Sequence, residues 1–412
     1  MQTHSTSQRN TNSLSVIHIA PTPFFSNRGC HIRILNEIDG LKKSDVHVIL
    51  CTYGLGDDIP GINIRRIPGI PGYTKKEAGF SPFKFIADIL LFFLVLRTAY
   101  KENATILHGH LHEGGLIGWA VKICLFWRKI FVVMDIQGSL SGELQSHGTF
   151  TQFPFLLRCF YFVEKLIALL PQRVVCSSPS SKDFITNTCK VNCNRVFLLG
   201  DVVPDNFFSH QRERKQQDRH SIPENKKIII YTGGLLPGKG VNFLLEAMKI
   251  VLTARDDVHF ILIGYPKEKV QAYTYHNSIG KSITLPGEVS YKHLAEWLAS
   301  ADAAIDPKPG GAGEASGKIL HYMASGLPVI CFATANNQSF LTDQCFYAAR
   351  ESSKDLAQAI HVALDSEEAR EKYGKIGRDR AKEKFSLFAA GNSLKNLYTE
   401  MITTSNAASQ KK

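Results

Sequence analysis

Short apolar runs alternate with helical segments through most of this chain. The first half holds seven runs that are rich in Val, Ile, Leu and Phe and have the length of strands: Val16–Ala20, Val46–Tyr53, Ile62–Ile67, Thr105–His110, Phe131–Ile136, Arg173–Ser178 and Arg195–Leu199. Helical patterns lie between most of them, at His31–Lys42, Phe83–Tyr100, Gly115–Leu125, Phe155–Leu170 and Ser180–Thr188. Continuous apolar strands that alternate with helices are typical of a parallel sheet with helices on both faces. The sequence therefore predicts a doubly wound α/β domain.

The same alternation restarts at Lys227, after a polar and charge-rich stretch at 209–227. The second set of strand-like runs is Ile228–Thr232, Val258–Gly264, Ile283–Leu285, Ala303–Asp306 and Val329–Phe332. The helical patterns between them are Val241–Thr253, Pro266–His276, Tyr291–Ser300 and Ser316–Ser325, and three more close the chain at Ser353–Leu364, Glu367–Lys384 and Leu387–Ile402. A length of 412 residues is enough for two domains.

These boundaries predict five parts in chain order. They are a disordered leader at 1–13, an N-terminal domain at 14–205, a linker at 206–226, a second domain at 227–385, and a crossing helix with a tail at 386–412. Ligands of open parallel sheets bind beyond the carboxyl ends of the strands, so we expect functional residues at those ends.

The charge balance suits an anionic partner. The chain has 48 Lys and Arg residues against 37 Asp and Glu, a net charge of +11. A nucleotide, a phospholipid surface and a nucleic acid all fit such a balance. No aromatic residues interleave the basic ones of the linker, which argues against a nucleic-acid-binding arm.

The cellular location is predicted from three features that the sequence lacks: a secretory signal, a membrane-spanning segment and paired cysteines. No secretory signal opens the sequence, and the longest apolar run, Phe85–Leu96, is broken by Asp88 and is shorter than the ~20 residues of a spanning helix. The nine cysteines are odd in number and form no Cys-x2-Cys pair, which favours reduced, buried side chains. We expect a cytoplasmic protein, with peripheral contact to the inner membrane left open.

A glycine-rich turn follows the first strand of the second half. It reads Tyr-Thr-Gly-Gly-Leu-Leu-Pro-Gly-Lys-Gly over Tyr231–Gly240. Gly233, Gly234 and Gly240 would let the backbone approach a ligand closely, and Lys239 stands at a helix start, which suits a phosphate. An ordinary turn with a solvated lysine is the alternative.

A second polar loop runs into a short helix at Glu314–Ile330. Ser316 and Gly317 open the predicted helix, and Lys318 adds a mobile charge in its first turn. Free backbone N–H groups at such a start suit a phosphate. Gly326 and Pro328 end the helix before an apolar strand.

Together, these two motifs resemble the donor-nucleotide site of family 4 retaining glycosyltransferases, whose architecture is called GT-B. The family's donor strand reads Tyr-x-Gly-Arg and then Lys-Gly; Tyr231, Gly233, Lys239 and Gly240 match it, and Gly234 replaces the arginine. The family's second motif leads into x-Met-Ala-x-Gly-x-Pro-Val, and the residues that match it are Met323, Ala324, Gly326, Pro328 and Val329.

The chain departs from that second motif at both of its glutamates. The ribose-binding glutamate falls on His321, which could make a single-point contact, unless it is a helix residue packed in the wall of the cleft. The glutamate that holds the sugar hydroxyls falls on Gly313, and the adjacent Glu314 could serve by a one-residue shift.

The resemblance implies both a fold and a reaction. It implies two Rossmann-like doubly wound domains facing across a cleft, with C-terminal helices that return toward the N-domain. It also implies transfer of a hexosyl group from a nucleotide-diphosphate sugar to a hydroxyl of a glycan or lipid-linked acceptor, with retention of configuration. Lys239, Lys318 and the helix start at Ser316 would stabilise the leaving diphosphate, without a metal or other cofactor.

In the N-terminal domain the resemblance implies three further contacts. Gly29 falls where the family has a glycine-rich loop near the donor phosphate, and the adjacent Arg28 could supply the charge missing at Gly234. Gln137 stands where the family has a histidine near the anomeric carbon; it can donate a hydrogen bond but cannot transfer a proton. Strand alternation puts Asp135 on the same face as Gln137.

A histidine-rich segment, His108-Gly-His-Leu-His-Glu113, follows the fourth strand-like run. Alternation would put His108, His110 and His112 on one side of an extended segment, which is a spacing that metal ligands use. We expect instead that His110 or Glu113 contributes to the acceptor site, and predict no metal centre.

Two apolar helical patterns, Phe83–Arg97 and Phe155–Leu170, have basic residues beside them. They fit helices that lie on an anionic membrane, or buried core helices. Other functions also stay open: a nucleotide-sugar 2-epimerase of the same architecture, a non-catalytic nucleotide-sugar-binding protein suggested by the departures, and a nucleic-acid binder.

Overall fold

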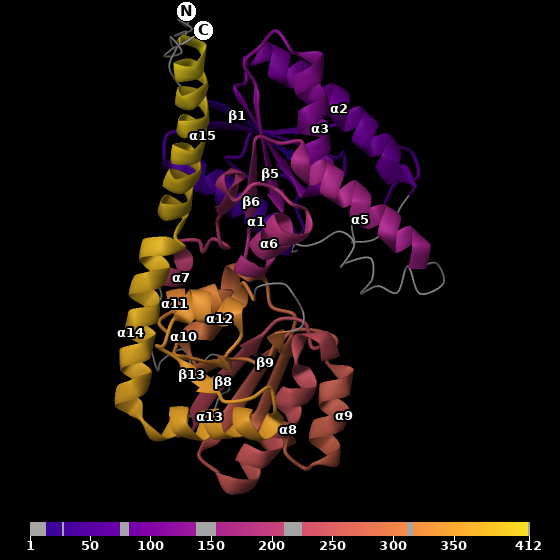
Figure 1. The fold of residues 1–412 in the computed structure, drawn as a ribbon. Helices are drawn as coiled ribbons and strands as arrows, with labels where there is room; N and C mark the ends of the chain where they lie inside the picture. Colours follow the sequence, from indigo (N-terminus) through magenta and orange to yellow (C-terminus); the bar gives the residue numbers. More distant parts are fainter. Residues whose placement is uncertain are drawn as a thin grey trace, which may run out of the picture. The chain divides into compact units, whose positions relative to one another are not determined.

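The computed structural model describes residues 14–26, 29–74, 82–136, 154–209, 225–310 and 316–410, without the side chains of 154–159 and 408–410. The chain divides into two compact units (Figure 1). Unit 1 contains Met1–Ser177, Ser181–Leu199 and Ala390–Lys412, and unit 2 contains Ser178–Ser180 and Gly200–Ala389.

Unit 1 is built on a seven-stranded sheet with the order β3-β2-β1-β4-β5-β6-β7. Its strands are β1 (Ser15–Ala20), β2 (His47–Thr52), β3 (Ile64–Arg66), β4 (Ile106–His110), β5 (Phe131–Ile136), β6 (Arg173–Cys176) and β7 (Val196–Leu198). All of its strand pairs are parallel. The sheet therefore needs helical crossovers, which place helices on both faces.

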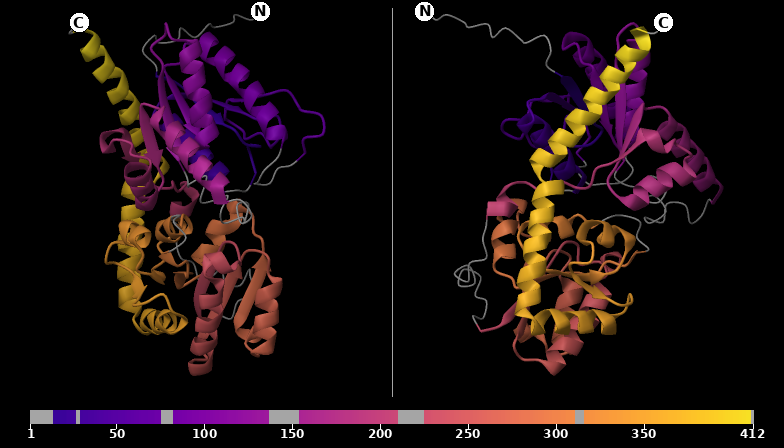
Figure 2. Two further views of the ribbon diagram at one scale, coloured as in Figure 1. Left: turned by 45° about the vertical axis from the view of Figure 1, so that its right-hand side comes forward. Right: turned by 60° about the vertical axis from the view of Figure 1, so that its left-hand side comes forward.

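The helices of unit 1 cover both faces of the sheet (Figure 2). They are α1 (Gly29–Lys43), α2 (Phe83–Lys101), α3 (Leu111–Cys124), α5 (Pro154–Leu169), α6 (Pro179–Asp183), the π-helical turn Phe184–Thr188, the 3-10 turn Cys193–Arg195 and most of α15 (Leu387–Gln410). Ile17 and Ile19 of β1 pack in the core with residues of α2 and α3. Because successive side chains of a strand alternate, His18 points to the opposite face.

Helix α15 is tied to α1 and to the sheet by close contacts. A Cβ on Gly391 would lie 1.9 Å from the carbonyl oxygen of Gly40, so only glycine permits this approach of the two helices. Lys395 donates a hydrogen bond to the carbonyl oxygen of Ser44 (2.7 Å). The sequence prediction that a C-terminal helix returns to the N-terminal domain is confirmed, since Ala390–Lys412 belongs to unit 1.

Unit 2 is built on a six-stranded parallel sheet with the order β10-β9-β8-β11-β12-β13. Its strands are β8 (Lys227–Thr232), β9 (Val258–Ile263), β10 (Ile283–Gly287), β11 (Ala303–Asp306), β12 (Val329–Phe332) and β13 (Phe346–Ala348). Its helices are α7 (Asn206–Ser209), α8 (Val241–Ala254), α9 (Glu268–His276), α10 (Leu294–Ala299), α11 (Lys318–Ala324), α12 (Ala335–Leu341), α13 (Ser353–Asp365) and α14 (Glu367–Lys384). In the described part of unit 2, 3-10 turns lie at Pro237–Lys239, Gly280–Ser282 and Tyr291–His293. One core lies under α8 and α13 and a second under α10 and α11.

The predicted pair of doubly wound domains is confirmed, and the structure also contains elements that the sequence did not predict. Strand β13 and helix α12 are additional elements. The units divide after Leu199, before the predicted boundary at 205. The segment predicted as a linker begins with α7, whose Phe207 is buried in a core of unit 2. A buried aromatic side chain holds this end of the segment against unit 2.

Candidate functional site

The carboxyl ends of β8, β9 and β10 are joined by backbone hydrogen bonds at three glycines. The N–H of Gly233 donates to Ile263 O, and the N–H of Gly264 donates to Gly287 O, both at 2.9 Å. A Cβ on Gly264 would lie 1.8 Å from Gly233 O. Gly233 has φ +124°, Gly264 +152° and Gly287 +84°, values that favour glycine. The chain after β8 is thus held as an open backbone surface with no side chain at Gly233.

Gly240 joins this surface to the loop after β11. It has φ +81° and directly precedes α8, and a Cβ there would lie 1.9 Å from Pro307 O. The 14 residues of α8 leave free N–H groups at this end. Lys239 precedes Gly240 in the turn Pro237–Lys239 and is partly exposed. Two segments about 70 residues apart in sequence therefore meet, which the phosphate-site prediction requires.

Lys318 is the second point at which these segments meet. The sequence predicted a mobile charge here, but the side chain is held by its neighbours. Its Nζ lies 3.1 Å from Asp306 Oδ1, 4.2 Å above the ring centre of Tyr231, and 3.5 Å from where a Cβ on Gly233 would lie. Burial disfavours the charge, but the Asp306 carboxylate and the nearby tyrosines raise the pKa of Lys318. The ammonium is thus a fixed cation beneath Gly233.

Asp306 is the functional candidate that the sequence analysis missed. It ends β11 and is fully buried. Within the described part of the chain, neither carboxylate oxygen accepts a hydrogen bond of good geometry, so Lys318 is its counter-ion. The sequence does contain a signal for Asp306, because it is a charged residue at the end of an otherwise apolar strand.

His321 has both ring nitrogens engaged inside unit 2. Its Nε2 lies 2.7 Å from the hydroxyl of Tyr291, and its Nδ1 lies 3.2 Å from Gly317 O. Its ring centre is 4.5 Å from that of Phe207. Burial lowers the pKa of His321 to about 4, so the imidazole is neutral near pH 7. This environment favours a packed histidine over the predicted ribose contact.

The turn before α11 is closely packed. Ser316 is buried, and its carbonyl oxygen accepts a hydrogen bond from the N–H of Ile319. A Cβ on Gly317 would lie 2.4 Å from Asp201 Oδ2. Helix α11 has seven residues and begins at Lys318. The predicted sugar ligand Glu314 lies outside the described residues.

In the glycine turn after β8, the carbonyl oxygen of Gly234 accepts a hydrogen bond from the Tyr231 hydroxyl at 2.8 Å.

In unit 1, two of the predicted donor contacts, Arg28 and Gln137, lie outside the described residues. Gly29 begins α1, and a Cβ there would meet nothing within 4 Å. Open space beside Gly29 is compatible with a ligand at this end of the helix.

The predicted acceptor residues are both engaged in side-chain pairs. His110 is fully buried, with Nε2 2.8 Å from His18 Nδ1 and Nδ1 3.2 Å from Asp135 Oδ2. Glu113 pairs with Lys84; burial raises the pKa of its carboxyl, and the Lys84 ammonium outweighs this and lowers it. Neither position supports direct contact with an acceptor.

The prediction that three histidines share one side of an extended segment is wrong for the third. Strand β4 ends at His110 and α3 begins at Leu111, so the two-residue alternation stops there. His112 instead lies 3.2 Å from Glu164.

Comparisons with known proteins agree with this geometry. Residues 226–366 match the family model described as "Glycosyl transferases group 1". The matched range contains the glycine turn, Asp306, Lys318 and His321.

Relatives extend the similarity across most of the chain. It is 22% identical over 387 residues to the capsular polysaccharide biosynthesis glycosyltransferase CapM of Staphylococcus aureus, covering 90% of this chain and 94% of that protein. It is 24% identical over 369 residues to the GPI3 subunit of the Saccharomyces cerevisiae phosphatidylinositol N-acetylglucosaminyltransferase, covering 84% of this chain and 73% of that protein.

Solved structures share the fold. Sucrose-phosphate synthase from Thermosynechococcus elongatus superposes with a TM-score of 0.77 at 16% identity, over 95% of this chain and all of that one. Anabaena HepE in complex with UDP superposes with a TM-score of 0.71 at 13% identity, over 94% of this chain and 100% of that one. The GT-B class of fold expected from the sequence is thereby confirmed.

Proposed function

We propose that this protein is a glycosyltransferase that moves a hexosyl group from a nucleotide-diphosphate sugar to an acceptor hydroxyl, with retention of configuration. The observation that carries the proposal is the meeting of Gly233, Gly240 and Lys318 at the carboxyl ends of β8 and β11, inside the segment that matches the group 1 family. Open backbone and fixed positive charge at the strand ends suit a diphosphate.

The reaction requires stabilisation of the leaving diphosphate. As the glycosidic bond breaks, negative charge grows on the phosphate oxygen that bonded the anomeric carbon. Lys239, the free N–H groups of α8 and the fixed charge of Lys318 would offset that charge without reorganising. No step in this account needs a metal ion or another cofactor.

The donor is proposed from the neighbouring structures. HepE was crystallised with UDP and with UDP-glucose, and TarM of S. aureus with UDP. UDP-sugars are therefore the first donors to test. The acceptor is proposed to be a glycan or a lipid-linked sugar, because CapM is named for capsular polysaccharide biosynthesis and GPI3 for transfer to phosphatidylinositol.

A product assay distinguishes this proposal from its alternatives. Purified protein incubated with UDP-sugars is expected to release UDP, slowly with water and faster with an acceptor, and NMR of the glycoside is expected to show the donor's anomeric configuration. Epimerised UDP-sugar would indicate an epimerase, and bound but unconverted nucleotide sugar a binding protein.

Lys239→Ala is expected to lower kcat/KM by roughly 10- to 100-fold while leaving the thermal midpoint unchanged, because it removes a partly exposed cation beside the diphosphate. Steady-state kinetics with a UDP-sugar measure the change. Lys249→Ala, an exposed lysine on α8, is the matched control and should behave as wild type. Equal activity in the two variants would remove Lys239 from the site.

We also propose that unit 1 docks on an anionic lipid surface at the cytoplasmic face of the inner membrane. Helix α2 buries one stripe, Ala87, Leu91 and Val95, so it is partly a core helix. Its other face and the turn after α3 expose large apolar side chains: Phe85, Ile86, Ile89, Phe93, Phe126 and Trp127. We call this set the aromatic surface. Phe126 is 80% exposed and Trp127 61%.

Basic residues border the aromatic surface. Arg128 donates hydrogen bonds to the carbonyl oxygens of Ala99 and Tyr100, which joins the turn after α3 to the end of α2. Arg97, Lys101 and Lys129 are exposed nearby. Apolar side chains flanked by cations suit the interface of an anionic bilayer. Among the residues described, no helix has the length and apolar character to span a membrane.

The double variant Phe126→Ser/Trp127→Ser is expected to lose most binding to phosphatidylglycerol vesicles in a sedimentation assay, because two exposed anchors are removed. Tyr275→Ser, which alters a residue 83% exposed in unit 2, should bind as wild type does. Unchanged sedimentation of the double variant would rule out this surface.

A further inference from the structure

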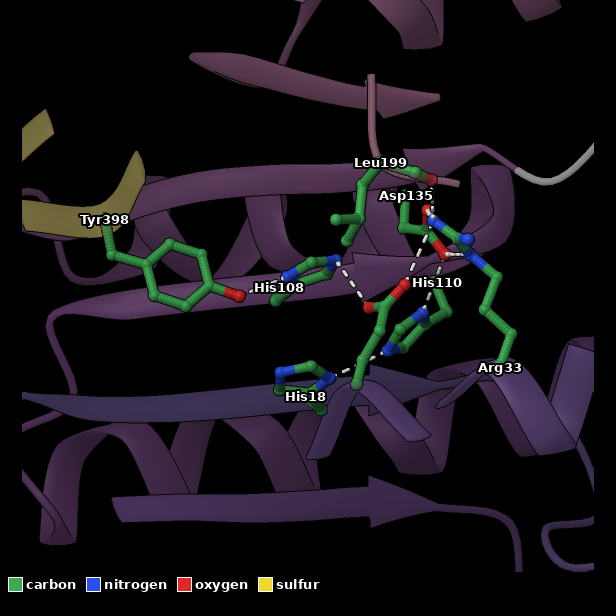
Figure 3. A network of polar contacts seen from close by, with 8 residues as sticks. His18, Arg33, His108, His110, Asp135, Leu199 and Tyr398 are labelled. Atoms are coloured by element: carbon green, nitrogen blue, oxygen red, sulfur yellow. Dashed lines mark hydrogen bonds and ion pairs between the residues drawn. The ribbon is translucent and has the colours of Figure 1, made fainter. Parts of the chain in front are cut away.

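A buried cluster of titratable side chains in unit 1 has no part in the proposed transfer. His18 lies on β1, His108 and His110 on β4, Asp135 on β5, and Arg33 and Glu37 on α1. All are at most 3% exposed. Figure 3 shows Tyr398 of α15 reaching the cluster from one end and Arg33 from the other.

The outer members of the cluster hold the inner ones in place. The Tyr398 hydroxyl lies 2.6 Å from His108 Nδ1, and His18 Nδ1 lies 2.8 Å from His110 Nε2. Arg33 donates to both Asp135 oxygens, at 2.8 and 3.0 Å, and lies 3.0 Å from Glu37 Oε1. Each inner histidine therefore has one nitrogen fixed by a neighbour, and each carboxylate is oriented by Arg33.

The inner residues also face one another, and Asp135 Oδ2, which accepts a hydrogen bond from Arg33 Nε, is shared with His110. His108 Nε2 forms no hydrogen bond with any described residue and lies 3.8 Å from Glu37 Oε2, which is too long for a hydrogen bond. His110 Nδ1 lies 3.2 Å from Asp135 Oδ2. Two ligands of one Zn²⁺, each at roughly 2.1 Å, lie roughly 3.4 Å apart in a tetrahedral site. One ligand atom from each of Glu37, His108, His110 and Asp135 can be chosen so that all lie within 4.8 Å of one another.

The charge of the cluster also calls for a cation. Within the cluster, the carboxylates of Glu37 and Asp135 lie beside the one guanidinium of Arg33. A buried net charge is unfavourable unless a counter-ion balances it.

We propose that Glu37 Oε2, His108 Nε2, His110 Nδ1 and Asp135 Oδ2 bind one divalent transition-metal ion of the zinc class. Two imidazoles with two carboxylates suit Zn²⁺. In metal sites the second nitrogen of a histidine ligand is usually hydrogen-bonded, and here Tyr398 and His18 fill that role. The ion would join α1, β4 and β5 and, through Tyr398, α15. It is a structural site, distinct from the metal-free transfer proposed for unit 2.

Metal analysis of the full-length protein tests this proposal. Protein purified without chelator should contain about one equivalent of zinc by mass spectrometry, since structural sites fill stoichiometrically. A chelator should lower its thermal midpoint and added Zn²⁺ should restore it. Cobalt replacement should give the visible absorption of a low-symmetry site.

Two variants localise the ion. His108→Gln should lose the metal, and His47→Gln, which changes an exposed histidine of β2, should keep it. Glu37→Gln gives a second test if His108→Gln does not fold. Metal retained in both ligand variants would overturn the proposal. So would wild-type protein that is metal-free and whose thermal midpoint responds to neither chelator nor Zn²⁺, in which case a proton balances the cluster.

Discussion

Lys318→Met is expected to destabilise the protein by roughly 3–5 kcal/mol, because it leaves the buried Asp306 carboxylate without its counter-ion. Lys318 Nζ is 3.1 Å from Asp306 Oδ1, and neither Asp306 oxygen accepts a well-formed hydrogen bond from a described residue. Urea unfolding measures the change. This result would not be expected of the mobile charge that the sequence motif predicts at Lys318, because a mobile charge has no buried partner.

The double variant Asp306→Asn/Lys318→Met separates the structural role of the lysine from its functional one. Removing both charges should recover most of the stability, because no unpaired buried ion remains. If the ammonium also stabilises the diphosphate, the double variant stays inactive although it is stable. A stable double variant with wild-type turnover would show that the pair only supports the fold.

Acid is expected to destabilise wild-type protein more than His321→Gln. Burial lowers the folded-state pKa of His321 from 6.5 to about 4, so the unfolded chain binds the proton more tightly. The stability contributed by neutral His321 is complete above pH 6.5 and is lost as the pH falls toward 4. A shift of this size corresponds to up to roughly 3 kcal/mol.

Unfolding free energies measured from pH 7 to pH 4 test this directly. Glutamine can keep hydrogen bonds to Tyr291 and Gly317 without titrating. The unfolding free energy of wild type minus that of His321→Gln should therefore become smaller as the pH falls. A difference that stays constant across this range would contradict the assignment. His18 and His108 titrate in both proteins and so cancel in the comparison.

The repeated strand and helix pattern was enough to predict two doubly wound units. Strand-like runs such as Phe131–Ile136 are buried on both faces and so read as continuous apolar segments. Strand β13 has only three residues, too few to show a period. Helix α12 is rich in Asn, Gln and Ser and is fixed instead by a cap, in which Thr334 Oγ1 accepts a hydrogen bond from the N–H of Asn337.

The candidate site was predictable where backbone conformation dictates the residue. Gly233 and Gly240 have positive φ, and a Cβ on Gly240 would also lie 1.9 Å from Pro307 O, so glycine is favoured at both positions. Partners of charged and polar groups were not predictable. The pairing of His110 with Asp135 depends on β4 and β5 being neighbours in the sheet, and the pairing of Lys318 with Asp306 depends on how α11 packs beside the end of β11. Sequence spacing encodes neither arrangement.

Binding of nucleotide sugars to wild type and to Lys239→Ala tests the central claim most directly. A thermal-shift panel of UDP-, GDP- and ADP-sugars should raise the wild-type midpoint with at least one donor, since a ligand that binds only the folded state stabilises it. The same donor should produce a smaller shift in Lys239→Ala and a full shift in Lys249→Ala. If no nucleotide sugar shifts the wild type, or if Lys239→Ala responds as fully as wild type, unit 2 does not bind a donor in the way described.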